Sequence, residues 1–276
     1  MDEGDGPAVI AFAATLLVAV QPVPAPAIML TGSLGQGATM TGQVPPGSIL
    51  TLNGQPVAVA PDGAFLIAFD RDAGPVAALV AILPDGRRLV RPLTIAPRAW
   101  RIERLPTLPR ISQPTPEFQR RRAPELAQIA AARDRATDAQ GWRQRFVWPV
   151  RGRVSGLFGA QRIYAGEPGA YHSGVDVARP TGTPVAAPAD GVVILAAPTP
   201  FTLEGNLLMI DHGMGLNSAF LHLSRIDVAV GDRVAQGQVV GAIGATGRAT
   251  GPHLHWGMKW HDARIDPLLL AGPMPQ

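Results

Sequence analysis

The chain has 276 residues, of which 46% are hydrophobic and 16% charged, and it carries a formal net charge of +3 at neutral pH. This length and composition predict a mainly globular protein with room for two domains. Cysteine is absent, which excludes a disulfide framework and a zinc site built on thiolates. No array of base-stacking aromatic residues accompanies the basic ones, so nucleic-acid binding is not expected.

Residues 1–27 are expected to form a signal peptide or an N-terminal anchor. Ala8–Val20 is a continuous apolar run that is short for a membrane span, and Ala25–Ala27 resembles the small-residue end of a secretory signal. The three acidic residues among the first five depart from the positive start of such signals. An uncleaved anchor and a buried strand are therefore alternatives, and we expect export to the periplasm or cell envelope.

Residues 28–97 are predicted to form a small β domain. The pairs Asn53–Gly54, Asp62–Gly63 and Asp85–Gly86 are typical of tight hairpin turns. Alternating apolar residues flank these turns, as in the run from Phe65 to Phe69. We expect an immunoglobulin-like or similar sandwich, which could act as a spacer, contact cell-envelope proteins or cover a site elsewhere in the chain.

Residues 98–145 are predicted to form a basic linker with one helix. The segment contains eleven arginines, together with several prolines that disfavour regular structure. A helix over Pro116–Asp138 would place Leu126, Ile129 and Ala130 on one side. We expect this helix to be solvated, and attraction of the arginines to an anionic cell envelope is the alternative.

Residues 146–270 are predicted to form an antiparallel β domain, which makes the fold class all-β in both domains. Short apolar runs recur between glycine turns, the pattern of strands folded into a sandwich or open barrel. The expected strands are 191–195, 206–210, 218–221, 233–235 and 239–243.

The chain has six histidines, and all lie at or after residue 172. His172 and Asp176 are four apart, and His253 and His255 are two apart, so each pair can share one side of a strand. Two histidines and a carboxylate are typical ligands of a catalytic zinc, which keeps a fourth position open for water. Four candidates for three positions leave one residue for proton transfer or transition-state stabilisation.

Further motifs follow one another in order between residues 146 and 270. The segments are Phe158–Arg162, His172–Asp176, Gly182–Val192, Asp211–Gly215, Leu221–Ser224, Val230–Val234, Gly241–Gly247 and Gly251–His255. Together they resemble the lysostaphin-type zinc endopeptidases, or LytM-like domains, which cut peptide bonds in bacterial peptidoglycan. The resemblance implies zinc ligands at His172, Asp176 and His255, with two non-ligand catalytic histidines at His222 and His253.

The function implied by this resemblance is zinc-dependent hydrolysis of peptide cross-links in peptidoglycan through a zinc-activated water. One of His222 and His253 would act as the general base and the other as the oxyanion partner, in an order that the sequence does not fix. A non-catalytic regulator of cell-wall hydrolases with the same fold is the alternative, and a wall-binding module with an incidental metal is a third. The complete ligand set favours the enzyme.

Two histidines are assigned no part in this chemistry. His212, in a His-Gly turn, is expected to be structural, and His261, in a polar turn, is expected to lie on the surface. The connections 163–171 and 199–206 are expected to border the substrate groove.

Overall fold

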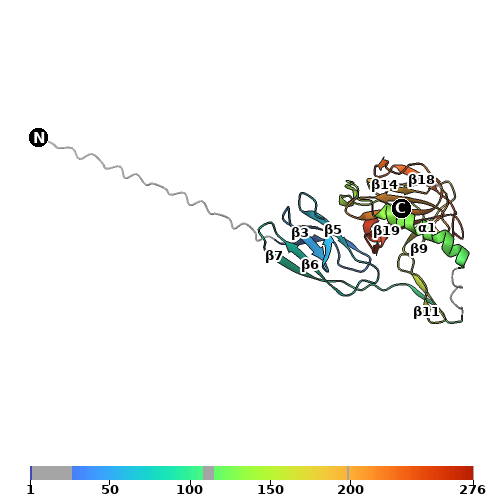
Figure 1. Ribbon diagram of the computed structural model, residues 1–276, viewed down its shortest axis with the longest axis horizontal. Coiled ribbons are helices and arrows are strands. Elements are labelled where there is room, and N and C mark those ends of the chain that lie inside the picture. The colour runs from blue at the N-terminus through green and yellow to red at the C-terminus, as the bar shows by residue number, and fades with distance from the viewer. Residues whose placement is uncertain (2–26, 108–114, 198, 276) are drawn as a thin grey trace.

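The computed structural model describes residue 1 and residues 27–107, 115–197 and 199–275. Strands dominate these residues, which confirms the all-β fold class. Figure 1 shows two lobes, with the N-terminal strands in one and the histidine-bearing strands in the other. The expected signal or anchor segment lies almost entirely outside the described residues.

The N-terminal lobe consists of two small antiparallel sheets. Asn53 and Gly54 have φ angles of 50° and 81°, as the predicted hairpin turn requires. Leu50, Phe65, Ile67 and Leu79 come from both sheets and are buried in one core. The sheet orders are β1-β2-β5 and β4-β3-β6-β7. The strands are β1 (Met29–Thr31), β2 (Thr39–Gln43), β3 (Ile49–Leu52), β4 (Gln55–Val57), β5 (Ala64–Ala68), β6 (Val76–Ile82) and β7 (Arg88–Thr94).

The C-terminal lobe is built on one ten-stranded sheet, ordered β17-β14-β15-β16-β19-β12-β9 with β13, β18 and β20 paired beside this path. Leu208, Phe220 and Trp256 are fully buried beneath it, so its apolar runs form a continuous core. The strands are β9 (Arg153–Gly156), β12 (Gly174–Ala178), β13 (Pro184–Ala186), β14 (Gly191–Ala196), β15 (Asn206–Asp211), β16 (Leu216–Ile226), β17 (Arg233–Val234), β18 (Val239–Ile243), β19 (His253–Trp260) and β20 (Ala263–Ile265).

The segment expected to be a linker is packed against the C-terminal lobe. Its first part forms β8 (Ile102–Leu105), which pairs in parallel with β10 (Gln161–Tyr164), and β10 also pairs with β11 (Glu167–Pro168). Its last part contains the 3-10 helix η1 (Gly141–Arg143). Trp142 there is 4% exposed, so the segment contributes to the core.

The predicted helix exists as α1 (Pro116–Arg133), but it ends five residues early, and it packs one side against the sheet while most of its residues stay exposed to solvent. Its buried residues are Ile129 and Ala132, whereas Leu126 is 50% exposed and Ala130 is exposed, so the expected apolar side was partly wrong. Both buried residues join a cluster with Leu207 and Met209 of β15. The helix therefore covers part of one sheet face. No described helix combines the length and apolar character needed to cross a membrane.

Ion pairing fixes the same helix from its polar side. The Arg122 guanidinium donates two hydrogen bonds of 2.6 Å to the Glu204 carboxylate, and Glu125 accepts from the backbone and hydroxyl of Thr202. These contacts join α1 to the connection between β14 and β15 across about eighty residues of sequence. Local apolar periodicity does not report such a polar contact, which is why the helix was expected to be solvated.

Replacing Ile129 with alanine should lower the free energy of unfolding by about 2–5 kcal/mol, because it leaves a cavity between α1 and the sheet. Chemical denaturation followed by tryptophan fluorescence measures the change. Leu126→Ala is the matched control on the same helix, and since that side chain is half exposed its effect should be small. Equal losses in the two variants would show that α1 is not packed through Ile129.

The two lobes meet around Arg71, whose side chain is buried although it is charged. Its guanidinium donates to the carbonyl of Gly159 and to Gln161 Oε1, and it stacks on the ring of Tyr171 at 4.6 Å. A second contact joins Arg98 to Asp266, which caps the short helix α2 (Pro267–Ala271). The junction thus holds the residue directly before His172.

Candidate metal centre

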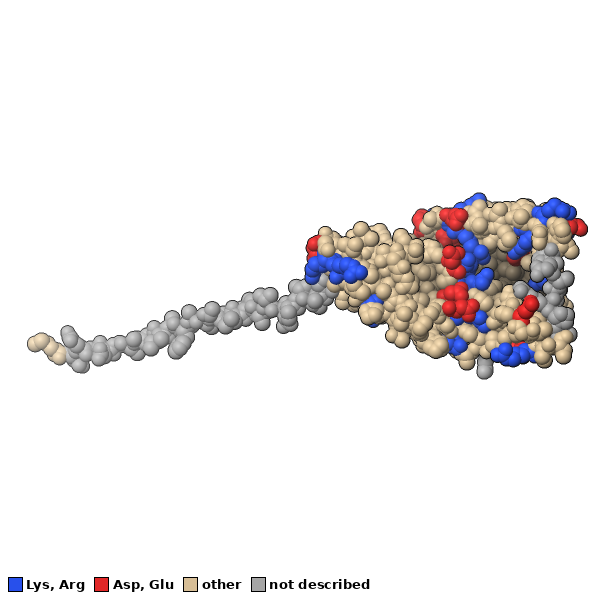
Figure 2. Space-filling view, turned by 60° about the horizontal axis from the view of Figure 1, so that its bottom comes forward, with Lys and Arg blue, Asp and Glu red and all other residues tan. Residues whose placement is uncertain are grey.

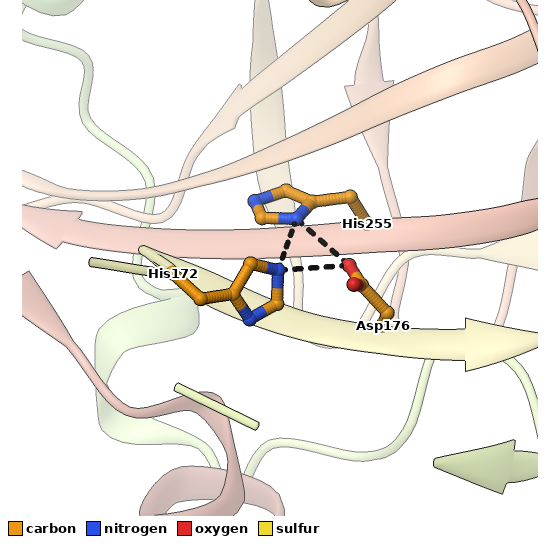
Figure 3. A group of neighbouring side chains, drawn as sticks. All are labelled: His172, Asp176 and His255. Carbon is orange, nitrogen blue, oxygen red and sulfur yellow. Dashed lines mark hydrogen bonds and ion pairs between the residues drawn. The ribbon is translucent and has the colours of Figure 1, made fainter. Parts of the chain in front are cut away.

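Two neighbouring strands position the candidate ligands. β12 and β19 are antiparallel, and their register pairs Asp176 with His255. His172 lies two residues before β12, where its ring turns back toward the same point. Figure 3 shows the three side chains pointing toward one another from these strands. The sequence-predicted ligand set is therefore brought together in space.

The three ligand atoms form a compact triangle. His172 Nε2 lies 3.0 Å from both Asp176 Oδ1 and His255 Nδ1, and His255 Nδ1 lies 2.9 Å from Asp176 Oδ1. Tetrahedral zinc with bonds of about 2.0–2.2 Å separates its ligand atoms by roughly 3.3–3.6 Å, slightly more than the sides of this triangle. Two imidazole nitrogens and one carboxylate oxygen at this spacing fit zinc. Three protein ligands leave the fourth tetrahedral position open for a further ligand.

Hydrogen bonding and burial favour the tautomers and protonation states in which the three side chains can bind a cation. His172 Nδ1 lies 3.0 Å from the carbonyl of Leu157, so Nδ1 carries the hydrogen and Nε2 presents its lone pair. Burial would raise the pKa of Asp176, but the adjoining imidazoles of His172 and His255 outweigh it and hold that pKa well below its usual range. Burial also lowers the pKa of His255, which favours its neutral, metal-binding form.

His222 occupies the point where β16 changes partner. β16 pairs with β19 as far as Leu221 and with β18 from Leu223 onward. Between them His222 has a φ of 65°, a left-handed conformation that costs a non-glycine residue roughly 1–3 kcal/mol. The local kink turns its ring toward the metal centre, with ring centroids 4.8 Å from His253 and 6.4 Å from His255.

The two non-ligand histidines share one hydrogen-bonding arrangement. Nδ1 of His222 lies 2.8 Å from the carbonyl of Thr246, and Nδ1 of His253 lies 2.8 Å from the carbonyl of Gly251. A carbonyl only accepts, so each Nδ1 carries a hydrogen and each Nε2 is left basic. His253 Nε2 lies 3.9 Å from Asp176 Oδ1, at the edge of the triangle. Both residues can therefore exchange a proton beside the metal position.

Two glycines beside the triangle leave space for the candidate ligand side chains. A Cβ at Gly156 of β9 would overlap Asp176 Oδ2 and come within 3.1 Å of His172 Cε1. A Cβ at Gly174 of β12 would come within 2.7 Å of His255 Nε2 and overlap the carbonyl of Trp256. Both positions border the triangle, so its shape depends on the missing side chains.

Replacing Gly156 with alanine should therefore weaken zinc binding by roughly 10- to 100-fold, the range seen when groups that orient a metal ligand are lost. Competition with a fluorescent zinc chelator measures the affinity. Gly74→Ala is the matched control, because that glycine has no atom within 4 Å of the added carbon and no positive φ. An unchanged affinity in Gly156→Ala would show that the ligands tolerate displacement.

His212 is structural in this fold, as its sequence context indicated. The ring is fully buried, with Nδ1 2.8 Å from the carbonyl of Asp190 and Nε2 2.8 Å from Ser218 Oγ. His261 is exposed in a turn, also as expected. Neither residue joins the metal triangle.

Burial lowers the pKa of His212 to about 4, and this should make the fold sensitive to acid. In the unfolded chain the His212 imidazole is protonated near pH 6.5, whereas in the folded chain it stays neutral down to about pH 4. Its contribution to the free energy of unfolding is therefore full above about pH 6.5 and is lost as the pH falls toward about 4. Between pH 7 and pH 5 the loss should be about 2 kcal/mol. Urea denaturation of the parent, His212→Gln and the exposed control His261→Gln measures it. His212→Gln should lose less free energy of unfolding between pH 7 and pH 5 than the parent, and His261→Gln should lose as much as the parent. Equal losses in all three proteins would contradict the lowered pKa of His212.

Two hollows lie on either side of the triangle. One is lined by residues of the 163–171 connection together with His172 and Asp176. The other lies between α1 and the sheet and is lined by Glu204 of the 199–206 connection and by His255. Residues of both connections expected to border the substrate groove thus line hollows beside the triangle, and Figure 2 shows that the surface of this lobe is hollowed beside charged side chains. The sequence did not indicate that α1 forms a wall.

Comparisons with known proteins agree with this geometry. The model of Peptidase family M23 matches residues 170–267, which hold all three candidate ligands. Peptidoglycan DD-endopeptidase ShyA of Vibrio cholerae is 41% identical over 114 residues, 41% of this chain and 26% of the relative. DD-carboxypeptidase/endopeptidase Mpg of Neisseria meningitidis is 38% identical over 124 residues, 45% of this chain and 28% of the relative. The chain thus spans about a quarter of the length of these curated relatives.

One solved structure extends the likeness to both lobes. A putative peptidase M23 from Pseudomonas aeruginosa is 30% identical, with a TM-score of 0.67, and the match covers 88% of this chain and 96% of that one. Sequence and fold therefore agree over nearly the whole of a solved relative, and the chain belongs to peptidase family M23.

Proposed function

We propose that this chain is a zinc-dependent endopeptidase that hydrolyses peptide cross-links of bacterial peptidoglycan, with His172, Asp176 and His255 as its metal ligands. The observation that carries the proposal is the triangle of ligand atoms, each within 3.0 Å of the others, flanked by two histidines with available Nε2 atoms. A curated relative named as a peptidoglycan DD-endopeptidase supports the substrate class.

The chain's own side chains divide the remaining work. Bound zinc would supply a water of near-neutral pKa and polarise the peptide carbonyl. His253, beside Asp176, and His222, on the kink of β16, then hold and move protons at their Nε2 atoms. Burial lowers the pKa of His222, so this ring is neutral and can accept a proton at pH 7.

The proposal includes export to the periplasm or cell envelope, because peptidoglycan lies outside the cytoplasmic membrane. The apolar run in residues 1–27 supports export by its composition. Contact of the N-terminal lobe with cell-envelope proteins is part of the same proposal, since that lobe contributes none of the three metal ligands.

Digestion of purified cross-linked peptidoglycan by the full chain tests this function. The products are resolved by mass, with and without a chelator, after loading with zinc. Chelator-sensitive conversion of cross-linked dimers to monomers is the expected result, and the masses identify the bond. Zinc binding without any conversion would instead favour the alternative function, a non-catalytic regulator of cell-wall hydrolases.

A further inference from the structure

The hollow between α1 and the sheet carries an unusual set of charges. It has a volume of about 220 Å³ and lies beside the metal centre, with His255 in its lining. Four basic residues line it, whereas Glu204 is the one acidic residue in the described lining. The basic residues are Arg122, Arg133, Lys259 and Arg264.

Glu204 is already engaged, so it leaves the other cations unbalanced. It pairs with Arg122 at 2.6 Å, and Arg122 also pairs with Glu125 at 3.0 Å. Within the described part of the chain, the Arg133 guanidinium makes no hydrogen bond or ion pair, and its Nε is buried.

The other two cations have only weak partners. Lys259 Nζ lies 3.7 Å from the fully exposed Asp262, a pair that water screens. The Arg264 guanidinium contacts the hydroxyl of Tyr171 at 3.4 Å and no described carboxylate. The half-buried Arg133 and Lys259 and the exposed Arg264 therefore face the hollow with no close carboxylate partner other than the exposed Asp262 among the described residues.

This arrangement is costly without a ligand. Burial lowers the pKa of Arg133, and the nearby Arg264 lowers it further. Burial and the charge of Arg133 likewise lower the pKa of Lys259. Desolvated like charges destabilise a fold unless an anion joins them. The side chain of Asn217, 4% exposed, also lines the hollow, and its buried Oδ1 has no partner. That amide oxygen only accepts hydrogen bonds, so it would bind an N–H or O–H group of a ligand, and the anion would be bound by the cations.

We propose that this hollow is a carboxylate-binding subsite, in which Arg133, Lys259 and Arg264 bind a carboxylate of the peptide held at the metal centre. The proposal rests on the proposed function and adds a specificity determinant to it. Arginine suits the role, because its guanidinium can donate two parallel hydrogen bonds to a carboxylate.

Strand geometry sets how far this carboxylate lies from the cleaved bond. His255, Gly257 and Lys259 alternate along β19 and line the same hollow. Four residues of strand span about 13 Å, and a lysine side chain reaches back part of that way. The recognised carboxylate should therefore lie roughly two to four residues from the reacting carbonyl.

A binding cycle tests the subsite independently of catalysis. Soluble cross-linked muropeptides, with their carboxyl groups free or chemically amidated, are titrated into the chelator-treated full chain, which cannot hydrolyse them. The parent should prefer the acid form by roughly 10- to 100-fold, the strength of charge-assisted hydrogen bonds. Arg133→Met should bring this ratio close to one. Arg120→Met, on the exposed side of the same helix, should leave it unchanged.

Thermal unfolding separates a binding role from a structural one. Because Arg133 is a half-buried cation with no ion-pair partner among the described residues, Arg133→Met should leave the unfolding temperature unchanged or raise it, and Lys259→Met gives a second variant. An unchanged acid-to-amide ratio in both variants would overturn the proposal. Peptides amidated at the C-terminus alone distinguish a terminal carboxylate from one on a side chain.

The hydrolysis assay keeps this outcome apart from that of the proposed function. If the zinc-loaded parent cleaves both the acid and the amidated dimers with equal kcat/KM, the enzyme stands and the subsite fails. If it cleaves neither while the chelator-treated chain still prefers the acid form, the carboxylate site stands and the endopeptidase fails.

Discussion

Replacing His255 with alanine should remove bound zinc and peptidoglycan hydrolysis together. Its Nδ1 is one corner of a triangle whose sides are 2.9–3.0 Å, and catalytic zinc sites hold the metal with three protein ligands. Removing a hydrogen-bonding partner of a metal ligand lowers metal affinity by roughly 10- to 100-fold, and removing the ligand itself should lower the affinity by more than that. Metal analysis after gel filtration and the release of monomers from cross-linked dimers measure the two effects.

The control for this variant is His261→Ala, which removes an exposed histidine from the same lobe and should keep both zinc and activity. Thermal unfolding of His255→Ala without metal checks that the fold survives. A variant that still bound one zinc per chain with unchanged affinity would place the metal elsewhere. A variant that lost zinc but kept hydrolysis would contradict a metal-dependent reaction.

The candidate site was predictable wherever its residues follow local rules. His253 and His255 alternate on a strand, and that strand exists as β19. Asp176 was expected on a strand or turn, and β12 brings it opposite His255. The alternation of side chains along one strand is a short-range property that composition and spacing express, whereas the pairing of Asp176 with His255 joins strands 79 residues apart. The hairpin turns of the N-terminal lobe were predictable for the same reason.

The features that the sequence did not predict all depend on distant parts of the chain. The apolar side of α1 was predicted correctly at Ile129 but wrongly at Leu126 and Ala130, because the helix packs through Ile129 and Ala132 against a sheet formed much later in the chain. Its Arg122 has a carboxylate partner 82 positions away. A basic segment with few apolar residues has the composition of a linker, and its sequence does not identify the distant residues that bind it. The unpaired charge of Arg133 is likewise a property of the assembled hollow and not of the local sequence.

His222 combines both situations, because its identity was predicted and its conformation was not. A strand residue that follows Leu221 should point to the opposite face of the sheet from it. The change of partner from β19 to β18 and the positive φ turn the ring toward His253 instead. A strained residue at this position, with its ring beside His253 and near the candidate ligand His255, supports a role in the reaction more strongly than a motif alone.

Replacing His222 should leave zinc bound and lower kcat by about 100- to 10,000-fold, the usual contribution of a positioned acid or base. His222→Asn is the sharper variant, because asparagine tolerates a left-handed backbone whereas alanine adds strain at a φ of 65°. If the loss came from the backbone, His222→Ala would be impaired and His222→Asn nearly normal. If it comes from the imidazole, both variants lose activity equally while metal analysis still finds one zinc per chain. Parent-like cleavage by His222→Asn would remove this residue from the proposed reaction and leave His253 to carry the proton transfer alone.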